Sequence, residues 1–438
     1  MTSEEALLKE FRGYVIMEPR PFVIDLERCD GMYLVTLEGR RIFDWANYYA
    51  SKLIGHNHPR LYEPEYVKRL VRAANNKVSS PDYVTTELIE YYRLLHQIAP
   101  KCMKNPELEI FTLNSGAEAV ENALKYMLKL YYEKAAGPER VVPRHSDRPC
   151  FVYFEKGFHG RTVYTLNVTN MPHNELVTQG FHGLTVENVM APFPAWNSDA
   201  LREDNETEID RCIDVLETLL TNNGFKIAGI IVEPMQGAGG HRVALPRFFQ
   251  RLSDIAHREN IPLCFDEVQT AGGLTGAVFQ CDQFDLPHSP DCVVSAKKFG
   301  SGVLYMRRPM KDVGVLDSTW SGTLADAVRF VQEWKIATED GLLAAVPELE
   351  THLLEGLFML QASHPKKIAN VRGYGLYQGF TLKKPMMLRS FVTRALKEED
   401  LLLQPAGEDT VRLRPNLNVT KVDIDLLISK LDRLLAKS

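Results

Sequence analysis

Residues 109–135 read EIFTLNSGAEAVENALKYMLKLYYEKA, and this stretch holds the pattern that decides the fold. A short β-type run, EIFTL, is followed three residues later by AEAVENALKYMLKLYYEKA, in which apolar residues recur at helical spacing. A short buried run followed by an amphipathic helix is typical of a mostly parallel sheet covered by helices on both faces. The stretch therefore predicts one strand-and-helix unit of an α/β fold.

The same pattern repeats through the middle of the chain. The further β-type runs are CFVYFE (150–155), IAGIIVEP (227–234), PLCFDEV (262–268) and CVVSA (292–296), and PRFFQRLSDIAHREN (246–260) has helical spacing. Such sheets bind ligands at the carboxyl ends of their strands. We therefore look for functional residues directly after each run.

The two ends of the chain have other patterns. GMYLVTLEGRRIFDWA suggests a hairpin that turns at Glu38 and Gly39. Beyond about residue 330, two long helices, a strand-like stretch at 370–382, a strand at 410–415 and a closing helix predict an α+β arrangement. The predicted parts are an N-terminal accessory segment (1–60), a large mostly parallel-sheet domain (61–330) and a smaller C-terminal α+β domain (331–438).

Composition narrows the classes of function. A chain of 438 residues that is 45% hydrophobic can bury a large core. Its formal net charge of -6 and the lack of a basic block argue against nucleic acid or a membrane as partner. No apolar stretch approaches the roughly 20 residues that span a bilayer, and the acidic N-terminus has no signal-peptide core. We therefore expect a cytoplasmic protein that acts on small polar molecules.

The seven cysteines are scattered without CxxC spacing, and several lie in apolar runs where a thiol packs as a small hydrophobe. We expect no disulfide and no bound metal. The cysteines are Cys29, Cys102, Cys150, Cys212, Cys264, Cys281 and Cys292.

The first candidate site follows EIFTL. Ser115, Gly116 and Ala117 open the long helix, where free N–H groups and the helix dipole favour an anion. The alternative is an ordinary capping box of Ser115 with Glu118, which is the simpler interpretation of this stretch alone.

The second candidate site follows CFVYFE. Phe158, His159 and Arg161 lie between and beside two glycines, and an aromatic ring with a guanidinium suits stacking and carboxylate recognition. The alternative is a half-buried phenylalanine beside a solvated arginine.

The third and fourth candidate sites follow the last two runs. Asp266 and Glu267 directly follow a buried run, where a carboxylate needs a partner; a structural ion pair is the alternative. Lys297 follows CVVSA beside a second cation, Lys298, and an amine in that setting can act as a nucleophile toward an aldehyde. A lysine pair on a solvated turn is the ordinary interpretation.

Together the four sites supply what pyridoxal 5'-phosphate requires, namely an anion cradle, an aromatic ring, an acid and a lysine. The motifs SGAEAVENALK, FHGRT, VEPMQGAGG, FDEVQTAGGLTG, SAKKFGSG and STWSG resemble the class III pyridoxal-phosphate aminotransferases of fold type I, over nearly the whole chain. Within that family, the KK pair, STW and PAGEDTVRLRPNLNV most resemble the L-lysine 6-aminotransferases. The resemblance implies a large sheet domain and a smaller C-terminal α+β domain.

The resemblance also identifies the lysine. The family places a small residue before the lysine that forms the Schiff base and small residues four and five positions after it. Ala296, Ser301 and Gly302 fit Lys297, whereas Lys298 follows a lysine. By the same resemblance, the phosphate is held by Ser115, Gly116 and Ala117, the ring is covered by Phe158, the pyridine nitrogen pairs with Asp266 and the ring hydroxyl bonds Gln269.

The resemblance implies a homodimer with shared sites, because Ser318 and Thr319 match a segment that reaches the phosphate in the neighbouring subunit. Arg161 and Arg414 match two carboxylate clamps. The implied reaction is ping-pong transfer of an amino group from an L-lysine-like donor, held at its α-carboxylate by Arg161, to 2-oxoglutarate. Alternatives are a 4-aminobutyrate or ornithine aminotransferase, a fold type I epimerase, racemase or decarboxylase, and a cofactor-binding protein without catalysis.

One residue departs from the family. Ala238 stands where terminal-amine aminotransferases typically have a glutamate that pairs with the arginine matched here by Arg414. The resemblance implies that this arginine stays open to α-carboxylates unless a neighbouring acid such as Glu233 replaces the glutamate.

Overall fold

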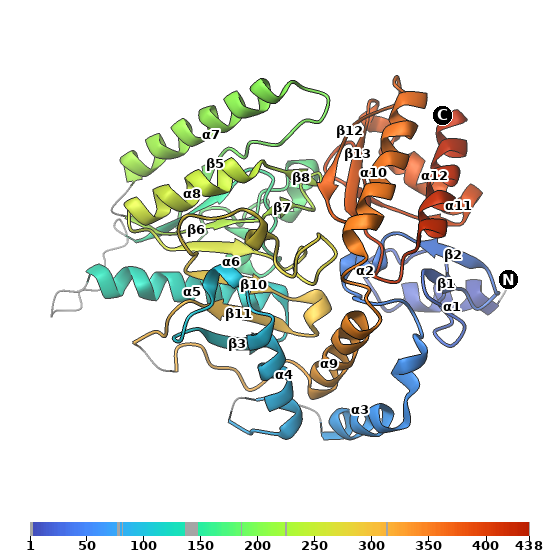
Figure 1. The fold of residues 1–438 in the computed structure, drawn as a ribbon, viewed down its shortest axis with the longest axis horizontal. Helices are drawn as coiled ribbons and strands as arrows, with labels where there is room; N and C mark the ends of the chain where they lie inside the picture. Colours follow the sequence, from blue (N-terminus) through green and yellow to red (C-terminus); the bar gives the residue numbers. More distant parts are fainter. Residues whose placement is uncertain are drawn as a thin grey trace.

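The computed structural model describes residues 3–76, 79–80, 82–135, 148–184, 186–223, 226–311 and 314–437. Its largest element is a seven-stranded sheet with the order β3-β11-β10-β9-β6-β4-β5 (Figure 1). The strands are β3 (Glu109–Leu113), β4 (Cys150–Phe154), β5 (Val189–Ala191), β6 (Ile227–Val232), β9 (Leu263–Asp266), β10 (Cys292–Ser295) and β11 (Gly302–Met306).

The sheet is mostly parallel. Strands β5, β4, β6, β9 and β10 pair in parallel, and only β11 runs antiparallel to its two neighbours, β10 and β3. All five predicted β-type runs form strands of this sheet, which confirms the α/β class. Strands β5 and β11 were not predicted from the sequence.

Helices cover both faces of this sheet. Phe151 and Tyr153 of β4 pack in one hydrophobic cluster with α5 (Gly116–Ala135), while Phe154 packs on the other face, with its ring 5.6 Å from that of Phe248 in α8 (Pro246–Arg258). Figure 1 shows α7 (Arg202–Asn223) and α8 above β6, and α5 below β6. Because both faces are buried, the strands have continuous apolar sequences.

The predicted N-terminal hairpin is confirmed by the antiparallel pair β1 and β2. Strand β2 also pairs in parallel with β14, so the N-terminal segment shares a three-stranded sheet with the C-terminal part of the chain. The strands are β1 (Tyr33–Val35), β2 (Arg41–Asp44) and β14 (Leu401–Leu402).

The C-terminal part contains a four-stranded sheet, β12-β13-β16-β15, with α10, α11 and α12 beside it (Figure 1). The strand-like stretch at 370–382 is two strands that turn at Gly375, where φ is 55° and an added Cβ would lie 2.4 Å from Leu274 O. The division into three domains stays a prediction. The strands are β12 (Ile368–Tyr374), β13 (Tyr377–Leu382), β15 (Gln404–Ala406) and β16 (Thr410–Leu413).

The remaining elements complete the described chain. The short strands β7 (Met235–Gln236) and β8 (Arg242–Val243) form a small pair. The other helices are α1 (Ser3–Arg12), α2 (Asn47–Ala50), α3 (Pro64–Asn76), α4 (Thr86–Gln97), α6 (Val163–Leu166), α7 (Arg202–Asn223), α9 (Leu324–Glu339), α10 (Val346–Ser363), α11 (Leu388–Glu399) and α12 (Lys421–Ala436).

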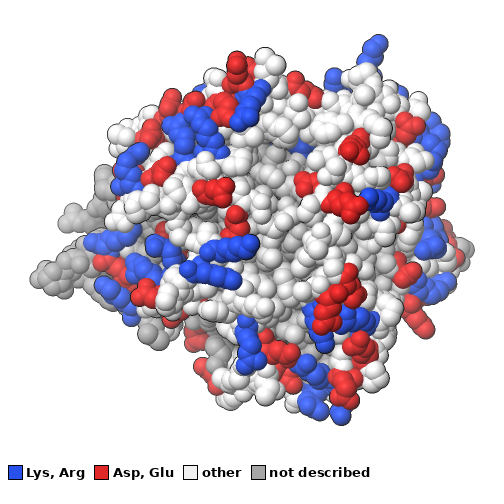
Figure 2. All heavy atoms as spheres, in the orientation of Figure 1, with Lys and Arg blue, Asp and Glu red and all other residues white. Residues whose placement is uncertain are grey.

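Within the described ranges, none of the helices has both the length and the apolar character that crossing a membrane requires. Figure 2 shows basic and acidic side chains interspersed over one face of the molecule, without a large area of one sign on that face.

Candidate active site

A cavity of about 1010 Å³ opens where β4, β6, β9 and β10 end. This is the edge at which α/β sheets bind ligands. Of the predicted site residues, the cavity is lined by Gly116, Ala117, Phe158, Arg161, Asp266, Gln269 and Lys297. Its walls also include Tyr49, His159, Glu233, Ala238 and Arg412, of which His159, Glu233 and Ala238 were noted from the sequence and Tyr49 and Arg412 were not predicted.

Lys297 lies two residues beyond the end of β10, and its side chain extends into this cavity. Its backbone has a φ of 56°, and its Nζ donates a hydrogen bond to Tyr49 O at 3.1 Å. Burial and the positive charges of Arg414 and Arg412 together lower the pKa of Lys297 to about 7. A substantial fraction of the amine is therefore uncharged near neutral pH and can act as a nucleophile.

Asp266, the last residue of β9, has the partner that its buried position requires. Its Oδ2 lies 2.7 Å from His159 Nδ1, and its Oδ1 accepts the Val268 N–H at 3.1 Å. Both side chains are almost fully buried. The carboxylate is thus fixed in orientation beside the cavity. A positively charged ligand atom in the cavity could pair with it. From the sequence, His159 was predicted only as part of a loop, because its contact with Asp266 joins the loop after β4 to the end of β9.

Glu233 joins the loops after β4 and β6. Its Oε1 accepts the Phe158 N–H at 2.7 Å and its Oε2 accepts the Gly237 N–H at 3.3 Å. Burial raises the pKa of Glu233 to about 7. The carboxylate thus positions Phe158, and it makes no ion pair with an arginine among the described residues.

The start of α5 has both a helix cap and residues that face the cavity, which were the two alternatives predicted from the sequence. Ser115 Oγ accepts the Glu118 N–H at 3.3 Å, and the Glu118 carboxylate accepts the Asn114 N–H at 2.9 Å, which is a cap. Gly116 and Ala117 nevertheless line the cavity, while Ser115 is exposed beside it. A Cβ on Gly116 would lie 2.7 Å from Val268 Cγ1, so this close approach requires glycine.

The role of the second predicted arginine, Arg414, stays a prediction. Arg414 is fully buried and is not among the residues that line the cavity; its guanidinium lies 5.9 Å from the Tyr377 ring, and its Nε, Nη1 and Nη2 have no hydrogen-bond partner among the described residues. Arg412, in β16, does line the cavity, and its Nη1 donates to Gly237 O at 3.0 Å. Residues two apart on a strand share a face, so the sequence pattern RLR does not distinguish the two.

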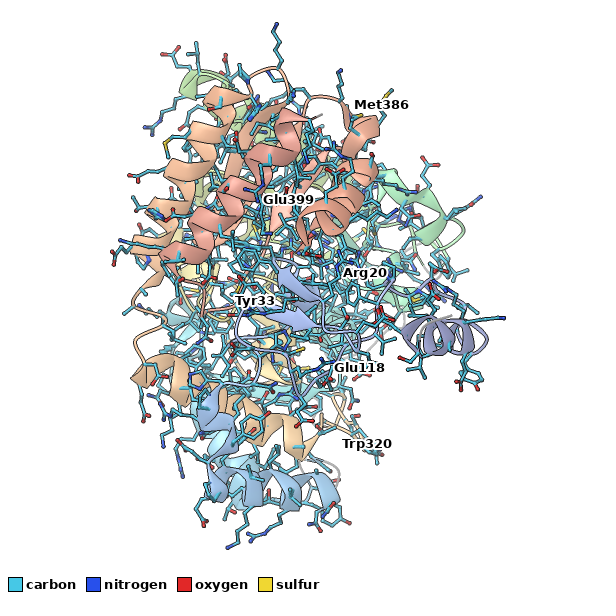
Figure 3. All side chains as sticks on the ribbon, turned by 90° about the vertical axis from the view of Figure 1, so that its right-hand side faces the viewer. Arg20, Tyr33, Glu118, Trp320, Met386 and Glu399 are labelled. Atoms are coloured by element: carbon cyan, nitrogen blue, oxygen red, sulfur yellow. The ribbon has the colours of Figure 1, made fainter. Side chains whose placement is uncertain are left out.

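Ser318 and Thr319 lie outside the cavity, at the surface beside the start of α5. Ser318 Oγ donates to Trp320 O, which also accepts a hydrogen bond from Asn114 Nδ2. Figure 3 labels Trp320 and Glu118, which mark this segment and the first turn of α5 on one side of the molecule. Their expected contact with a neighbouring subunit stays a prediction.

The cavity fits pyridoxal 5'-phosphate on the evidence of its own unpaired groups. Gln269 Oε1 is buried without a hydrogen-bond partner and would accept a hydroxyl proton. Asp266 presents a carboxylate, Lys297 an amine and Phe158 an aromatic ring to the same space. A pyridine nitrogen, an aldehyde, a ring face and a ring hydroxyl are the complementary groups of the cofactor.

The seven cysteines carry free thiols. Cys102 and Cys281 lie with their sulfurs 3.8 Å apart, beside Asp282, away from the residues that line the cavity. The sequence analysis did not anticipate this pair.

Comparison with known proteins agrees with this geometry. A family model described as "Aminotransferase class-III" matches residues 14–435. The chain is 31% identical to the L-lysine-epsilon aminotransferase of Mycobacterium bovis over 431 residues, covering 95% of this chain and 92% of the relative. It is 28% identical to the mitochondrial 4-aminobutyrate aminotransferase of Mus musculus over 438 residues, covering 94% and 84%. The solved structure of lysine aminotransferase from M. tuberculosis is similar, with a TM-score of 0.91, 28% identity and full coverage of both chains.

Proposed function

The chain belongs to the class III aminotransferase family, whose members are pyridoxal 5'-phosphate-dependent transaminases, and we propose that it moves the terminal amino group of an L-lysine-like donor to 2-oxoglutarate. The observation that carries the proposal is the cavity itself, which brings Lys297, Asp266 and Gln269 together with arginines that include Arg161 and Arg412. The similarity to lysine and 4-aminobutyrate aminotransferases supports a terminal-amine donor.

The cofactor would be held by groups that already face the cavity. Lys297 would bind it through its amine, Asp266 would face the ring nitrogen, Gln269 the ring hydroxyl, Phe158 the ring face, and Gly116 with Ala117 the phosphate. When bound, the cofactor supplies an electron sink for the bonding electrons of the donor carbon.

The proton transfer is the task of Lys297. The amine must accept a proton from the donor carbon and then deliver it to the cofactor. Its pKa should therefore lie near the working pH. Burial and the two neighbouring arginines lower the pKa of Lys297 to about 7, which meets that requirement. The Tyr49 carbonyl, 3.1 Å from Nζ, keeps the amine at the cavity wall.

Asp266 supplies the opposite charge. An ionised carboxylate beside the ring nitrogen favours the protonated ring and thereby strengthens the electron sink. The hydrogen bonds from His159 and from the Val268 N–H hold both oxygens in place before the ligand arrives, so no reorganisation is needed during the reaction.

Two of the arginines that line the cavity, Arg161 and Arg412, suit an acceptor that has two carboxylates. Arg161 comes from the loop after β4 and Arg412 from β16 of the other sheet, and neither makes an ion pair within the described part of the chain. Guanidinium groups bind carboxylates through paired N–H donors. Arg161 would hold the α-carboxylate of an L-lysine-like donor while the far amine of that donor reaches the cofactor, and the two arginines together would grip 2-oxoglutarate. Separate donor and acceptor half-reactions at one site make the mechanism ping-pong.

The assembly and location are part of the proposal. Ser115 is exposed at the phosphate end of the cavity and Ser318 and Thr319 lie nearby at the surface, which suits a homodimer with shared sites. A cytoplasmic location stays a prediction.

The test is a half-reaction experiment on the holoenzyme. L-lysine, L-ornithine and 4-aminobutyrate are added one at a time without acceptor, and the cofactor absorbance is followed. We expect L-lysine to convert the cofactor to its amino form most rapidly, and 2-oxoglutarate to restore the original spectrum. A faster reaction with ornithine or 4-aminobutyrate would reassign the donor, and the absence of any 2-oxoglutarate-dependent recovery would favour an epimerase, racemase or decarboxylase.

A further inference from the structure

Lys297 and Lys298 are adjacent in sequence but point to different places. The left-handed backbone of Lys297, with a φ of 56°, sends its side chain to the cavity, while Lys298 enters the protein interior and is only 2% exposed. The Lys298 Nζ lies 2.8 Å from Gln269 O, 3.3 Å from Ala50 O and 3.2 Å from Tyr377 Oη. These three partners belong to three separate parts of the chain.

The partner Ala50 lies in an unusual turn. Asn47, Tyr48, Tyr49 and Ala50 all have positive φ, between 44° and 67°, and none is glycine. Such a run is unfavourable for L-residues and must be held by contacts from outside. The two adjacent lysines donate to two adjacent carbonyls of this turn, Lys297 to Tyr49 O and Lys298 to Ala50 O.

The partners Gln269 and Tyr377 connect this turn to the rest of the site. Gln269, whose carbonyl accepts from Lys298, is the residue whose side-chain oxygen faces the cavity without a partner. Tyr377 begins β13, and its ring also contacts the Arg414 guanidinium. One amine thus connects the turn that holds Lys297, the loop that carries Gln269 and the C-terminal sheet.

The charges around Lys298 do not favour an ammonium ion. Lys297 and Arg414 add positive charge, and Lys298 makes no ion pair in the described part of the chain. The nearest acid, Glu267, has its oxygens occupied by the Thr270 hydroxyl and by two backbone N–H groups. An unpaired buried ammonium would be costly.

The hydrogen bonds accommodate an uncharged amine, and the lack of an acidic partner in the described part of the chain distinguishes it from an ammonium ion, which could donate to the same three oxygens. Such an amine has two N–H donors and one lone pair, and Lys298 has two carbonyls and one hydroxyl within reach. The Tyr377 hydroxyl has no other partner among the described residues, so it can donate its proton to the lone pair.

We propose that Lys298 is a positioning residue that works as an uncharged amine. It holds the Tyr49 carbonyl and the Gln269 side chain where Lys297 and the cofactor need them, and it does so without placing a second positive charge beside Lys297. The proposal rests on the proposed role of Lys297 as the cofactor-binding amine. It concerns a residue outside the cavity wall, and it assigns Lys298 no contact with substrate or cofactor.

The charge state is tested in the apoprotein, without turnover. The rate at which fluorodinitrobenzene arylates Lys297 is measured against pH by peptide mass spectrometry, and only the uncharged amine reacts. We expect Lys298→Met, which has similar length and no charge, to leave the midpoint near that of the unmodified protein. We expect Lys298→Arg to lower it by about one pH unit or more, because it adds a permanent neighbouring charge. A raised midpoint in Lys298→Met together with an unchanged one in Lys298→Arg would show a charged Lys298 and overturn the proposal.

The positioning role is tested by cofactor affinity. Lys298→Met leaves two buried carbonyls without donors, so we expect the dissociation constant of pyridoxal 5'-phosphate to rise about tenfold or more. Lys298→Gln, which keeps N–H donors and no charge, should recover part of the loss, and it replaces the methionine variant in both assays if that variant does not fold. Lys134→Met is the matched control, because Lys134 bonds Asn260 O away from the cavity. Unchanged affinity in Lys298→Met, or an equal loss in Lys134→Met, would overturn the role. Cofactor attachment at a lysine other than Lys297 would instead contradict the proposed function.

Discussion

Ala238→Glu is expected to shift donor preference toward terminal amines. Ala238 lines the cavity, and the carbonyl of its neighbour Gly237 accepts a hydrogen bond from Arg412 Nη1 at 3.0 Å. Arg412 Nε has no partner, and Glu233 is occupied by two backbone N–H groups. Arg412 is therefore open to an α-carboxylate in both half-reactions, so the unmodified enzyme should accept glutamate or alanine comparatively well as donors.

The size of the shift follows from the competition for Arg412. Opposite charges 4 Å apart attract by about 4 kcal/mol at an effective dielectric constant of about 20, and desolvation of the new carboxylate offsets part of this. A hydrogen bond to a charged group contributes about 1.5–3 kcal/mol net, which an incoming α-carboxylate would have to displace. Donors held by Arg412 should thus lose roughly 10- to 100-fold in kcat/KM. A terminal-amine donor held by Arg161 should retain its kcat/KM.

The assay is the ratio of kcat/KM for L-lysine to that for L-glutamate and L-alanine, measured for the unmodified protein and for Ala238→Glu. Ala238→Gln is the matched control, because it has nearly the same shape and no charge. An unchanged ratio in Ala238→Glu would refute the reasoning. The same shift in Ala238→Gln would show that bulk, and not the charge on Arg412, determines the preference.

Four further outcomes are expected. Lys297→Ala should abolish transfer, whereas Lys298→Ala should retain turnover at reduced cofactor affinity; borohydride reduction and peptide mapping should label Lys297, and a label on Lys298 would contradict the assignment. Asp266→Asn should lower kcat by orders of magnitude with an unchanged unfolding midpoint, because a neutral amide does not stabilise the protonated ring; a rate like that of the unmodified enzyme would make Asp266 structural. Arg412→Met should raise KM for 2-oxoglutarate, while Arg414→Met should leave it nearly unchanged, since only Arg412 lines the cavity. Capture of pyridoxal 5'-phosphate by the apoprotein should become faster as pH rises through about 7, because the Lys297 amine loses its proton there, and a rate that does not change between pH 6 and 8 would contradict the lowered pKa.

The sequence predicted the fold where hydrophobic runs were long and separated by helices. Four of the five predicted strands, β4, β6, β9 and β10, are buried along their whole length, whereas β3 is buried only at its last two residues. Strand β5 has only three residues, and its middle residue, Met190, is exposed, so it has no comparable signal. Strand β11 follows β10 after a short connection with no helical period between them, and its antiparallel pairing breaks the alternating pattern.

The sequence predicted site residues that directly follow strands, because the end of a parallel strand fixes their place without further information. Asp266 and Lys297 are of this kind, whereas Gln269 was predicted from the family resemblance; all three line the cavity. Tyr49 was not predicted as a site residue, and the contact of His159 with Asp266 was not predicted, because the contacts with the Asp266 carboxylate and the Lys297 amine join distant segments. Local spacing contains no signal for such contacts.

Two pairs of basic residues show where the limit lies. For Lys297 and Lys298, the family resemblance distinguishes the two members through the small residues at 296, 301 and 302, and in the structure Lys297, with its left-handed backbone, lines the cavity while Lys298 does not. For Arg412 and Arg414, the local sequence does not decide which guanidinium meets a carboxylate. The ring of Tyr377 lies beside Arg414, and the Trp45 carbonyl accepts its backbone N–H. The family pattern can therefore distinguish the lysines, whereas the surroundings of the arginines come from segments that are distant in sequence.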